Sequence, residues 1–170
     1  MRVVVGIDPG LASTGFGIVG EQGGRFRHLG HEVFRSSSSD STGERLHAIH
    51  RGLMRVVERY RPSEAAVETL YFARNVSSAL PVAQARGVML LALEQAGVQA
   101  HEYSPQAIKL AIVGRGRAEK EQVQELVRVL LGLEQMPSSD HAADALAVAI
   151  CHLQSSAGLR RIQAGLAGSS

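Results

Sequence analysis

The chain has 170 residues, of which 45% are hydrophobic and 20% are charged. This is the composition of a folded globular domain and excludes an intrinsically disordered chain. The formal net charge is only +2, so the overall charge gives no sign of a nucleic-acid partner and local clusters of basic residues must carry that information. One such cluster comprises Lys109, Arg115, Arg117 and Lys120.

The sequence gives no sign of export or of a membrane anchor. No stretch approaches the roughly 20 apolar residues of a spanning helix, and the opening apolar run is too short for a signal peptide. The single cysteine, Cys151, lies in an apolar run and suits a core residue of a protein in a reducing compartment. We therefore expect a cytoplasmic protein without a membrane partner.

Taken in chain order, the pattern predicts a sheet that begins with an antiparallel meander. Residues 2–7 are β-branched and apolar, and Asp8-Pro9-Gly10 ends this strand. Two more strands flank the turn-forming residues 20–24. Strands and helices then alternate. The expected strands are 2–7, 16–19, 26–34, 65–69 and 98–103, and the expected helices are 42–60, 76–96, 118–131 and 140–153, with a short helix after Ser104-Pro105.

This order of elements predicts an α/β fold in one domain. Three antiparallel strands followed by parallel strands form a mixed five-stranded sheet, with helices on both faces. We expect the domain to span residues 1–154 and residues 155–170, rich in Gly, Ser and Ala, to form a flexible tail.

Acidic residues stand at the ends of structured elements in three remote segments. Asp8 ends the first strand, Glu68 lies near the end of a later one, and Asp140, His141 and Asp144 open the last helix. Residues three or four apart project from one face of a helix. Hard oxygen ligands of this kind suit Mg²⁺ or Mn²⁺, and two such ions about 3.5–4 Å apart can cleave a phosphodiester.

Each of these residues also has an ordinary structural interpretation. Asp8 fits a turn, His141 and Asp144 fit satisfied polar groups, and Asp140 fits a helix N-cap better than a metal ligand. Glu68 is harder to explain this way, because an ionised carboxylate in a buried strand needs a partner. The agreement among the three segments favours a metal site.

The residues that carry these acids resemble the motifs of RuvC-type Holliday junction resolvases. The similar segments are Gly6-Ile7-Asp8-Pro9-Gly10 with Thr14-Gly15-Phe16-Gly17, Glu68 to Asn75, Ser78-Ala79-Leu80, Gln84-Ala85-Arg86-Gly87, Gly114 to Val123, and Asp144-Ala145-Leu146-Ala147. The resemblance covers residues 2–153. It implies a ribonuclease-H-like fold and a homodimer that resolves four-way junction DNA by symmetric paired nicks, in recombination and repair.

The resemblance also implies the catalytic and metal-binding residues. They are Asp8, Glu68, His141 and Asp144, holding two Mg²⁺ ions, with Mn²⁺ also supporting activity. Many relatives have an acid where this chain has His141, so Asp140 stays open as an alternative ligand. Imidazole binds Mn²⁺ more readily than Mg²⁺, so the metal preference can differ from that of relatives.

The expected DNA contacts are assigned in part by matching positions of the resembling family. Lys109 and Lys120 match basic residues of the family, and the Phe72 position is associated there with distortion of the junction. Arg74 can pair with a backbone phosphate, and Arg115 and Arg117 belong to the basic cluster. The helix 76–96 carries small residues and is the expected dimer interface, although a core helix fits the same pattern. Branch-migration helicase proteins are the implied partners.

Three other functions fit parts of the sequence. An actin-like phosphotransferase or ATPase could use Asp8-Pro9-Gly10 and a turn at Gly15 and Gly17 to hold phosphate. A related nuclease acting on RNA, simple duplexes or other branched DNA would share the metal site. A catalytically silent junction-binding module would result if His141 failed to complete that site.

Overall fold

The computed structural model describes residues 1–69 and 76–167, with the side chains of residues 1–69 and 79–156. Its strands are β1 (Arg2–Asp8), β2 (Ser13–Gln22), β3 (Arg25–Arg35), β4 (Glu64–Glu68) and β5 (Gln99–Tyr103). Its helices are α1 (Thr42–Tyr60), α2 (Val76–Gln95), α3 (Pro105–Val113), α4 (Lys120–Leu131) and α5 (Asp140–Ala167). No helix of the described part is long and apolar enough to cross a membrane.

The five strands form one mixed sheet in the order β3-β2-β1-β4-β5. β2 pairs antiparallel with both β1 and β3, whereas β4 lies parallel to β1 and to β5. The β2–β3 hairpin turns at Gly23 and Gly24, both with positive φ (62° and 79°), which glycine adopts without strain. The mixed α/β sheet expected from the sequence is confirmed.

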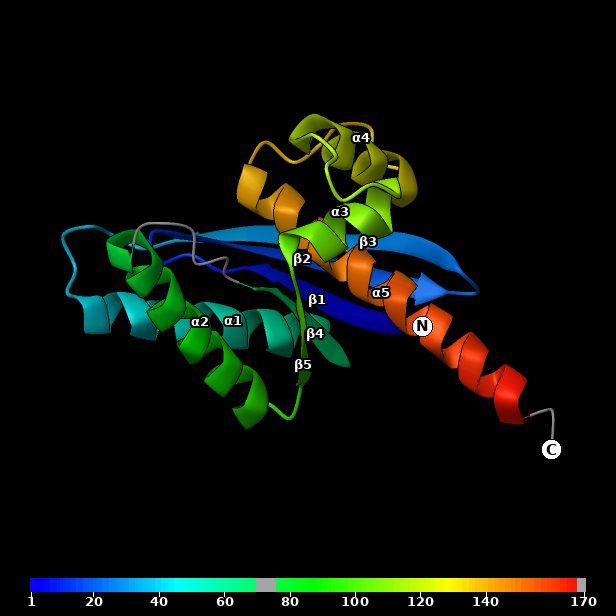
Figure 1. Cartoon of the computed structure of the whole chain (residues 1–170). Helices are drawn as coiled ribbons and strands as arrows, with labels where there is room; N and C mark the ends of the chain where they lie inside the picture. Colours follow the sequence, from blue (N-terminus) through cyan, green and yellow to red (C-terminus); the bar gives the residue numbers. More distant parts are fainter. Residues whose placement is uncertain (70–75, 168–170) are drawn as a thin grey trace.

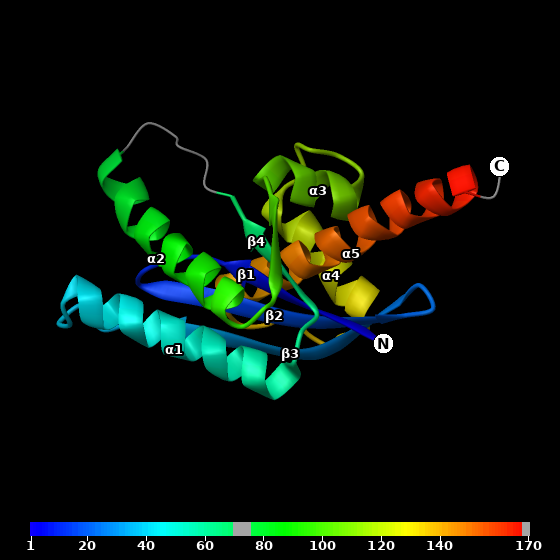
Figure 2. The same ribbon diagram turned by 90° about the horizontal axis from the view of Figure 1, so that it is seen from below.

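Helices cover both faces of the sheet, as expected (Figure 1). α1 and α2 pack on one face, and α5, with α3 and α4 beyond it, packs on the other (Figures 1 and 2). Neighbouring residues of β1 face opposite sides of the sheet, since Val4 packs toward α5 and Val5 toward α1 and α2. Because side chains alternate along a strand, β1 is buried on both sides and is apolar throughout its centre.

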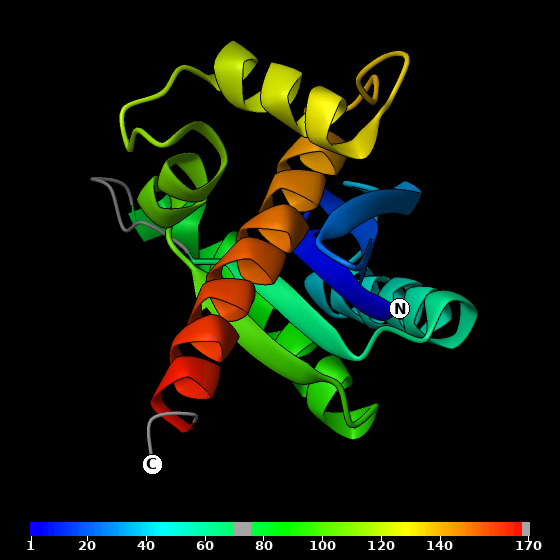
Figure 3. The ribbon, with the colours of Figure 1, turned by 90° about the vertical axis from the view of Figure 1, so that its right-hand side faces the viewer.

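α5 crosses the sheet at very short range (Figure 3). A Cβ atom at Gly6 would lie 1.9 Å from the carbonyl oxygen of Ala145, and one at Gly15 would lie 1.9 Å from that of His141. A Cβ at Gly17 would lie 2.4 Å from the backbone nitrogen of Leu146. Glycines on two strands therefore let the helix backbone rest directly on the sheet.

Two expected boundaries are wrong. β2 runs from Ser13 to Gln22 rather than from residue 16 to 19, because strand pairing on both sides holds a glycine-rich segment extended. The last helix continues to Ala167, past the end expected at Leu153, and no proline follows Leu153 to end it there. The flexibility of residues 155–170 stays a prediction. Cys151 is a buried free thiol, as expected.

We predict that Gly15→Ala destabilises the protein by about 1–3 kcal/mol, the usual cost of forcing extra atoms into a packed interior. The added methyl group would push against the backbone of α5 at His141. The measurement is urea unfolding of the metal-free protein. Gly43→Ala is the matched control, since a Cβ at this helical glycine meets nothing within 4 Å. Equal stability of Gly15→Ala and the parent would refute the close contact.

Candidate active site

Asp8 and Glu68 lie next to each other at the ends of two neighbouring strands. β1 and β4 are parallel neighbours in which Ile7 pairs with Val67, so Asp8 and Glu68 follow a matched pair at the same end of the sheet. The carboxyl ends of adjacent parallel strands are a common place for functional side chains. Asp8 and Glu68, 60 residues apart in sequence, thus become neighbours.

α5 brings the other two candidates to the same place. His141 Nδ1 lies 2.7 Å from Asp8 Oδ2, a hydrogen-bonding distance. Asp144, one turn further along α5, accepts a hydrogen bond of 3.1 Å from Lys120 Nζ. Lys120 is the first residue of α4, and its ammonium group also lies 3.2 Å from Asp140 Oδ2.

The electrostatics of this group show an excess of negative charge. Burial, with Asp8 and Asp144 nearby, raises the pKa of Glu68 to about 7. Burial also raises the pKa of Asp8, although the hydrogen bond to His141 opposes the shift. Desolvated carboxylates that repel one another are stabilised by a cation. Oxygen donors with one imidazole suit Mg²⁺ or Mn²⁺, so the residues present fit the expected metal.

The candidate site opens into a cavity of about 210 Å³. Glu68, Asp144, Lys109 and Lys120 supply its polar lining. Its apolar lining comes from Pro105, Ile108, Val123 and Ala147. The two lysines predicted to contact DNA therefore share one hollow with two of the predicted catalytic acids.

The remaining predicted residues divide into three groups. Arg115 and Arg117 are exposed and line shallow hollows away from the acids, so the structure does not bring them to this site. Phe72 and Arg74 lie outside the described residues. The N-cap interpretation of Asp140 is wrong, because α5 begins at Asp140 itself and its carboxylate accepts a hydrogen bond from Gln124.

A second hollow beside His141 was not anticipated. Gly10, Ser13 and Arg45 line it together with His141. Ser13 Oγ is buried and has no hydrogen-bond partner among the described residues. Arg45 lies on the amphipathic helix α1, and no spacing in the sequence connects it with Asp8.

Comparison with known proteins gives a consistent result. The family model described as crossover junction endodeoxyribonuclease RuvC matches residues 4–152. A protein of that name from Heliobacterium modesticaldum is 52% identical over 149 residues, which cover 88% of this chain and 92% of the relative. One from Treponema pallidum subsp. pallidum is 52% identical over 153 residues, covering 90% and 78%.

Solved structures agree with the sequence relatives. Thermus thermophilus RuvC is 40% identical with a TM-score of 0.82, covering 89% of this chain and 93% of that one. The same protein in complex with a Holliday junction substrate gives 39% identity and a TM-score of 0.88, covering 92% and 95%. The yeast mitochondrial Holliday junction resolvase Ydc2, at 13% identity, a TM-score of 0.66 and coverage of 93% and 82%, shares the fold alone.

The strand order and directions, with helices on both faces, define a ribonuclease-H-like fold. The match of the family model and the identity to its members place the chain more narrowly. It belongs to the crossover junction endodeoxyribonuclease RuvC family.

We predict that Glu68→Gln raises the Tm of the metal-free protein at pH 8. The folded-state pKa of about 7 lies above the ordinary value of 4.5, so folding stability falls as pH rises between these values and the full cost is present above pH 7. Removing about 1 kcal/mol or more of this destabilisation of the folded state would raise the Tm by about 2–4 °C at pH 8. The gain should shrink at pH 5, because Glu68 is then largely protonated in the folded state.

Thermal unfolding in EDTA, with variant and parent compared at each pH, measures this difference. Glu58→Gln, on the exposed face of α1, is the matched control and should leave the Tm unchanged at both values of pH. A Glu68→Gln protein no more stable than its parent at pH 8 would show that the carboxylate is not under the repulsion described.

Proposed function

We propose that this protein is a metal-dependent endonuclease that resolves four-way DNA junctions. The convergence of Asp8, Glu68, His141 and Asp144 at one end of the sheet is the observation that carries the proposal. The relatives named above support the substrate, since one of them is described in complex with a Holliday junction.

In this proposal Asp8, Glu68, Asp144 and His141 hold two divalent ions, Mg²⁺ or Mn²⁺. The ions supply an activated water and neutralise the departing oxygen of the phosphodiester. The protein's part is to hold the carboxylates where a phosphate can approach, at the ends of strands and on a helix that packs closely on the sheet. His141 is favoured over Asp140 as the fourth ligand, because Asp140 is 72% exposed and turns toward Lys120.

Lys120 acts in the proposal as a phosphate contact. Its position at the start of α4 is unfavourable for a cation in the helix dipole, and Asp140 and Asp144 compensate. With Asp144 holding a metal ion, the ammonium group of Lys120 would be available to the DNA backbone. Lys109, on the wall of the same cavity, is placed to contact the same strand.

The hollow lined by Arg45 is proposed as a second contact for the scissile strand. The cavity with Lys109 and Lys120 borders Glu68 and Asp144, whereas the hollow with Arg45 and Ser13 borders His141. A strand that enters both hollows would then meet Lys109 and Lys120 in one and Arg45 in the other. Phe72 and Arg74 keep their proposed roles in distorting the junction and binding its backbone.

α2 supports the proposed homodimer. Leu80 and Leu91 are 59% and 55% exposed, and Gln84 and Gly87 are exposed between them, along one side of the helix. A helix that is apolar both toward the core and toward solvent has a surface for a partner. A second copy meets the need for two symmetric cuts. Branch-migration helicase partners and a cytoplasmic location remain parts of the proposal.

The structure does not support the actin-like alternative. It required Gly15 and Gly17 to form a phosphate-binding turn, and both glycines lie in the middle of β2 beneath α5. Their role is to admit the helix backbone. Nucleases acting on RNA or simple duplexes remain the competing class, and substrate competition separates them.

We predict that Asp8→Asn lowers the rate of junction cleavage by more than about 100-fold, because even the loss of an outer-shell partner of a metal ligand costs about 10- to 100-fold. Binding to the junction should persist, since the basic surface is intact. The measurement is a gel assay with a synthetic four-way junction and its matched duplex, with and without Mg²⁺. Phe72→Ala should weaken cleavage more than binding in the same assay.

Asp40→Asn is the matched control, because Asp40 is an exposed aspartate that is not among the proposed ligands. It should cut at the parental rate. Near-normal cleavage by Asp8→Asn would refute the site. Preferential cleavage of duplex or hybrid over the junction by the parent would refute the substrate.

A further inference from the structure

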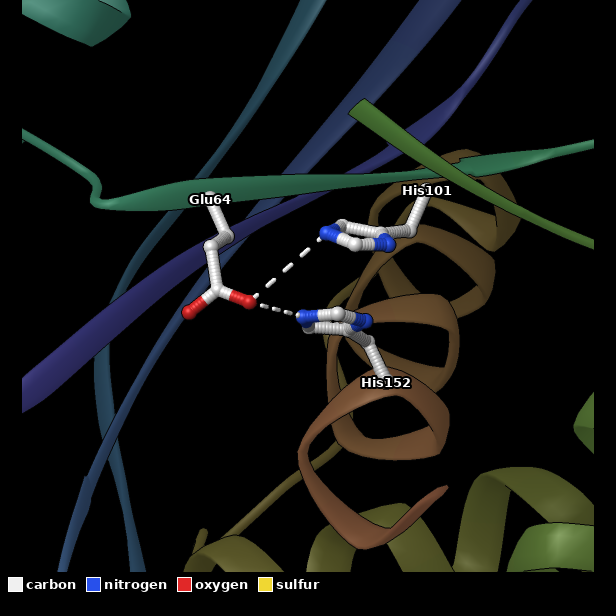
Figure 4. A group of neighbouring side chains, drawn as sticks. All are labelled: Glu64, His101 and His152. Atoms are coloured by element: carbon white, nitrogen blue, oxygen red, sulfur yellow. Dashed lines mark hydrogen bonds and ion pairs between the residues drawn. The ribbon is translucent and has the colours of Figure 1, made fainter. Parts of the chain in front are cut away.

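A second group of metal-binding side chains lies at the opposite end of β4 from Glu68. Glu64 begins β4, His101 lies in the neighbouring strand β5, and His152 projects from α5 (Figure 4). One ligand atom of each residue lies within 4.8 Å of the other two, which makes this the one such group of three among the described residues. Both imidazoles turn a ring nitrogen toward the same carboxylate oxygen (Figure 4).

His152 is held in the orientation that a metal ligand requires. Its Nε2 lies 2.7 Å from Glu64 Oε2, and its Nδ1 lies 2.7 Å from the hydroxyl group of Tyr103. With the Nδ1 proton donated to that hydroxyl, Nε2 carries a lone pair. A ligating histidine commonly bonds an outer partner through its other nitrogen in this way.

His101 has a ring nitrogen that could bind a metal ion. Its Nε2 is buried, has no hydrogen-bond partner among the described residues, and lies 3.8 Å from Glu64 Oε2. A buried polar atom without a partner costs free energy. The gap is too long for a hydrogen bond, but a metal ion can bridge it. In a tetrahedral site with bonds of about 2.0–2.1 Å, neighbouring ligand atoms are roughly 3.3 Å apart.

We propose that Glu64, His101 and His152 bind a divalent transition-metal ion of the Zn²⁺ type, separately from the catalytic ions. Two imidazoles and one carboxylate with a fourth position left for water make a known type of zinc site. The mixed nitrogen and oxygen donors distinguish it from the carboxylate-rich catalytic site, which suits Mg²⁺. His101 and Glu64 are 33% and 23% exposed, which leaves a route for the ion from solvent.

The protonation states of the donors suit a metal. The hydrogen bond from Arg2 lowers the pKa of Glu64 to about 2, so this carboxylate is ionised. Burial lowers the pKa of His152, so its imidazole is neutral near pH 7. Metal ligands must be deprotonated before they bind, and a neutral His152 needs only to carry its proton on Nδ1, facing Tyr103, rather than on Nε2, facing Glu64.

Arg2 is the natural competitor of the ion. Its Nη2 lies 3.0 Å from His152 Nε2 and 2.5 Å from Glu64 Oε2, while its Nε donates to Glu64 Oε1 at 2.5 Å. The metal requires Nη2 to withdraw, whereas the bond to Oε1 can persist and orient the carboxylate. Because Arg2 also donates to Ser156 Oγ, it has a second acceptor to which it can turn.

The proposed ion would join β4, β5 and α5. α5 also carries His141 and Asp144, so binding at His152 holds the helix against the sheet at a second point. Anything that binds the folded state and not the unfolded state raises the Tm in a concentration-dependent manner.

The test uses the full chain with Asp8→Asn and Glu68→Gln, which removes two of the four proposed catalytic ligands. Co²⁺ is titrated while the visible absorption of a four-coordinate site is followed, and Zn²⁺ then displaces it. We expect one equivalent of metal per chain and a rise in Tm. Tyr103→Phe should weaken binding by about 10- to 100-fold, as for other outer-shell partners, and His101→Phe by at least as much.

Two controls make the result decisive. His28 Nε2 and His31 Nδ1 lie 2.9 Å apart on the surface of β3, so His31→Phe tests for an adventitious surface site. It should bind as the parent does. His101→Gln repeats the test with a polar side chain should His101→Phe fail to fold. Unchanged affinity in both His101 variants, or loss of binding only in His31→Phe, would overturn the proposal.

His101→Phe in the otherwise unaltered chain should still cleave junctions in Mg²⁺. The second site can therefore fail without affecting the proposed nuclease function, and the reverse also holds.

Discussion

The direct contact between the backbone of α5 and the glycines of β1 and β2 is the constraint on which the site depends. Gly6, Gly15 and Gly17 leave no side chain between strand and helix, and alanines of α5 fill the contact from the other side. This closeness lets a side chain as short as Asp8 reach His141 at 2.7 Å. An added methyl group at any of the three positions would separate the helix from the sheet, and the acids of the two elements would no longer meet.

That packing brings together charges that repel one another. Asp8 and Glu68 are desolvated, and both have raised pKa values for that reason. Lys120 offsets the charges of Asp140 and Asp144, and His141 partners Asp8. The site is thus assembled with cationic or hydrogen-bonding substitutes, which divalent ions can replace. The proposed site at the other end of β4 is similar, because Glu64 is paired there with the cationic side chain of Arg2. Two histidines also face the Glu64 carboxylate.

Much of the fold was predictable because local patterns and tertiary structure agree. The apolar run of β1, the Gly-rich turn before β3 and the amphipathic α1 each predicted their element correctly. β2 was underestimated because its glycines lack a strand signal of their own and are required by α5 instead. The extent of α5 was missed because the Gly, Ser and Ala residues of its last part suggested a flexible tail. The acids of the site were predictable as ends of elements, whereas the grouping of Glu64, His101 and His152 depends on strand register and helix position. No spacing in the sequence reveals such a grouping.

The most direct test is a crystal structure of the protein with Mn²⁺, in which anomalous scattering locates the ions. The proposal predicts two peaks at the end of β1 and β4, shared among Asp8, Glu68 and Asp144, with His141 in contact with one of them. Lys120 should then have moved away from Asp144. Carboxylates too far apart to share an ion, or Mn²⁺ bound only at Glu64, His101 and His152, would contradict the proposed nuclease site.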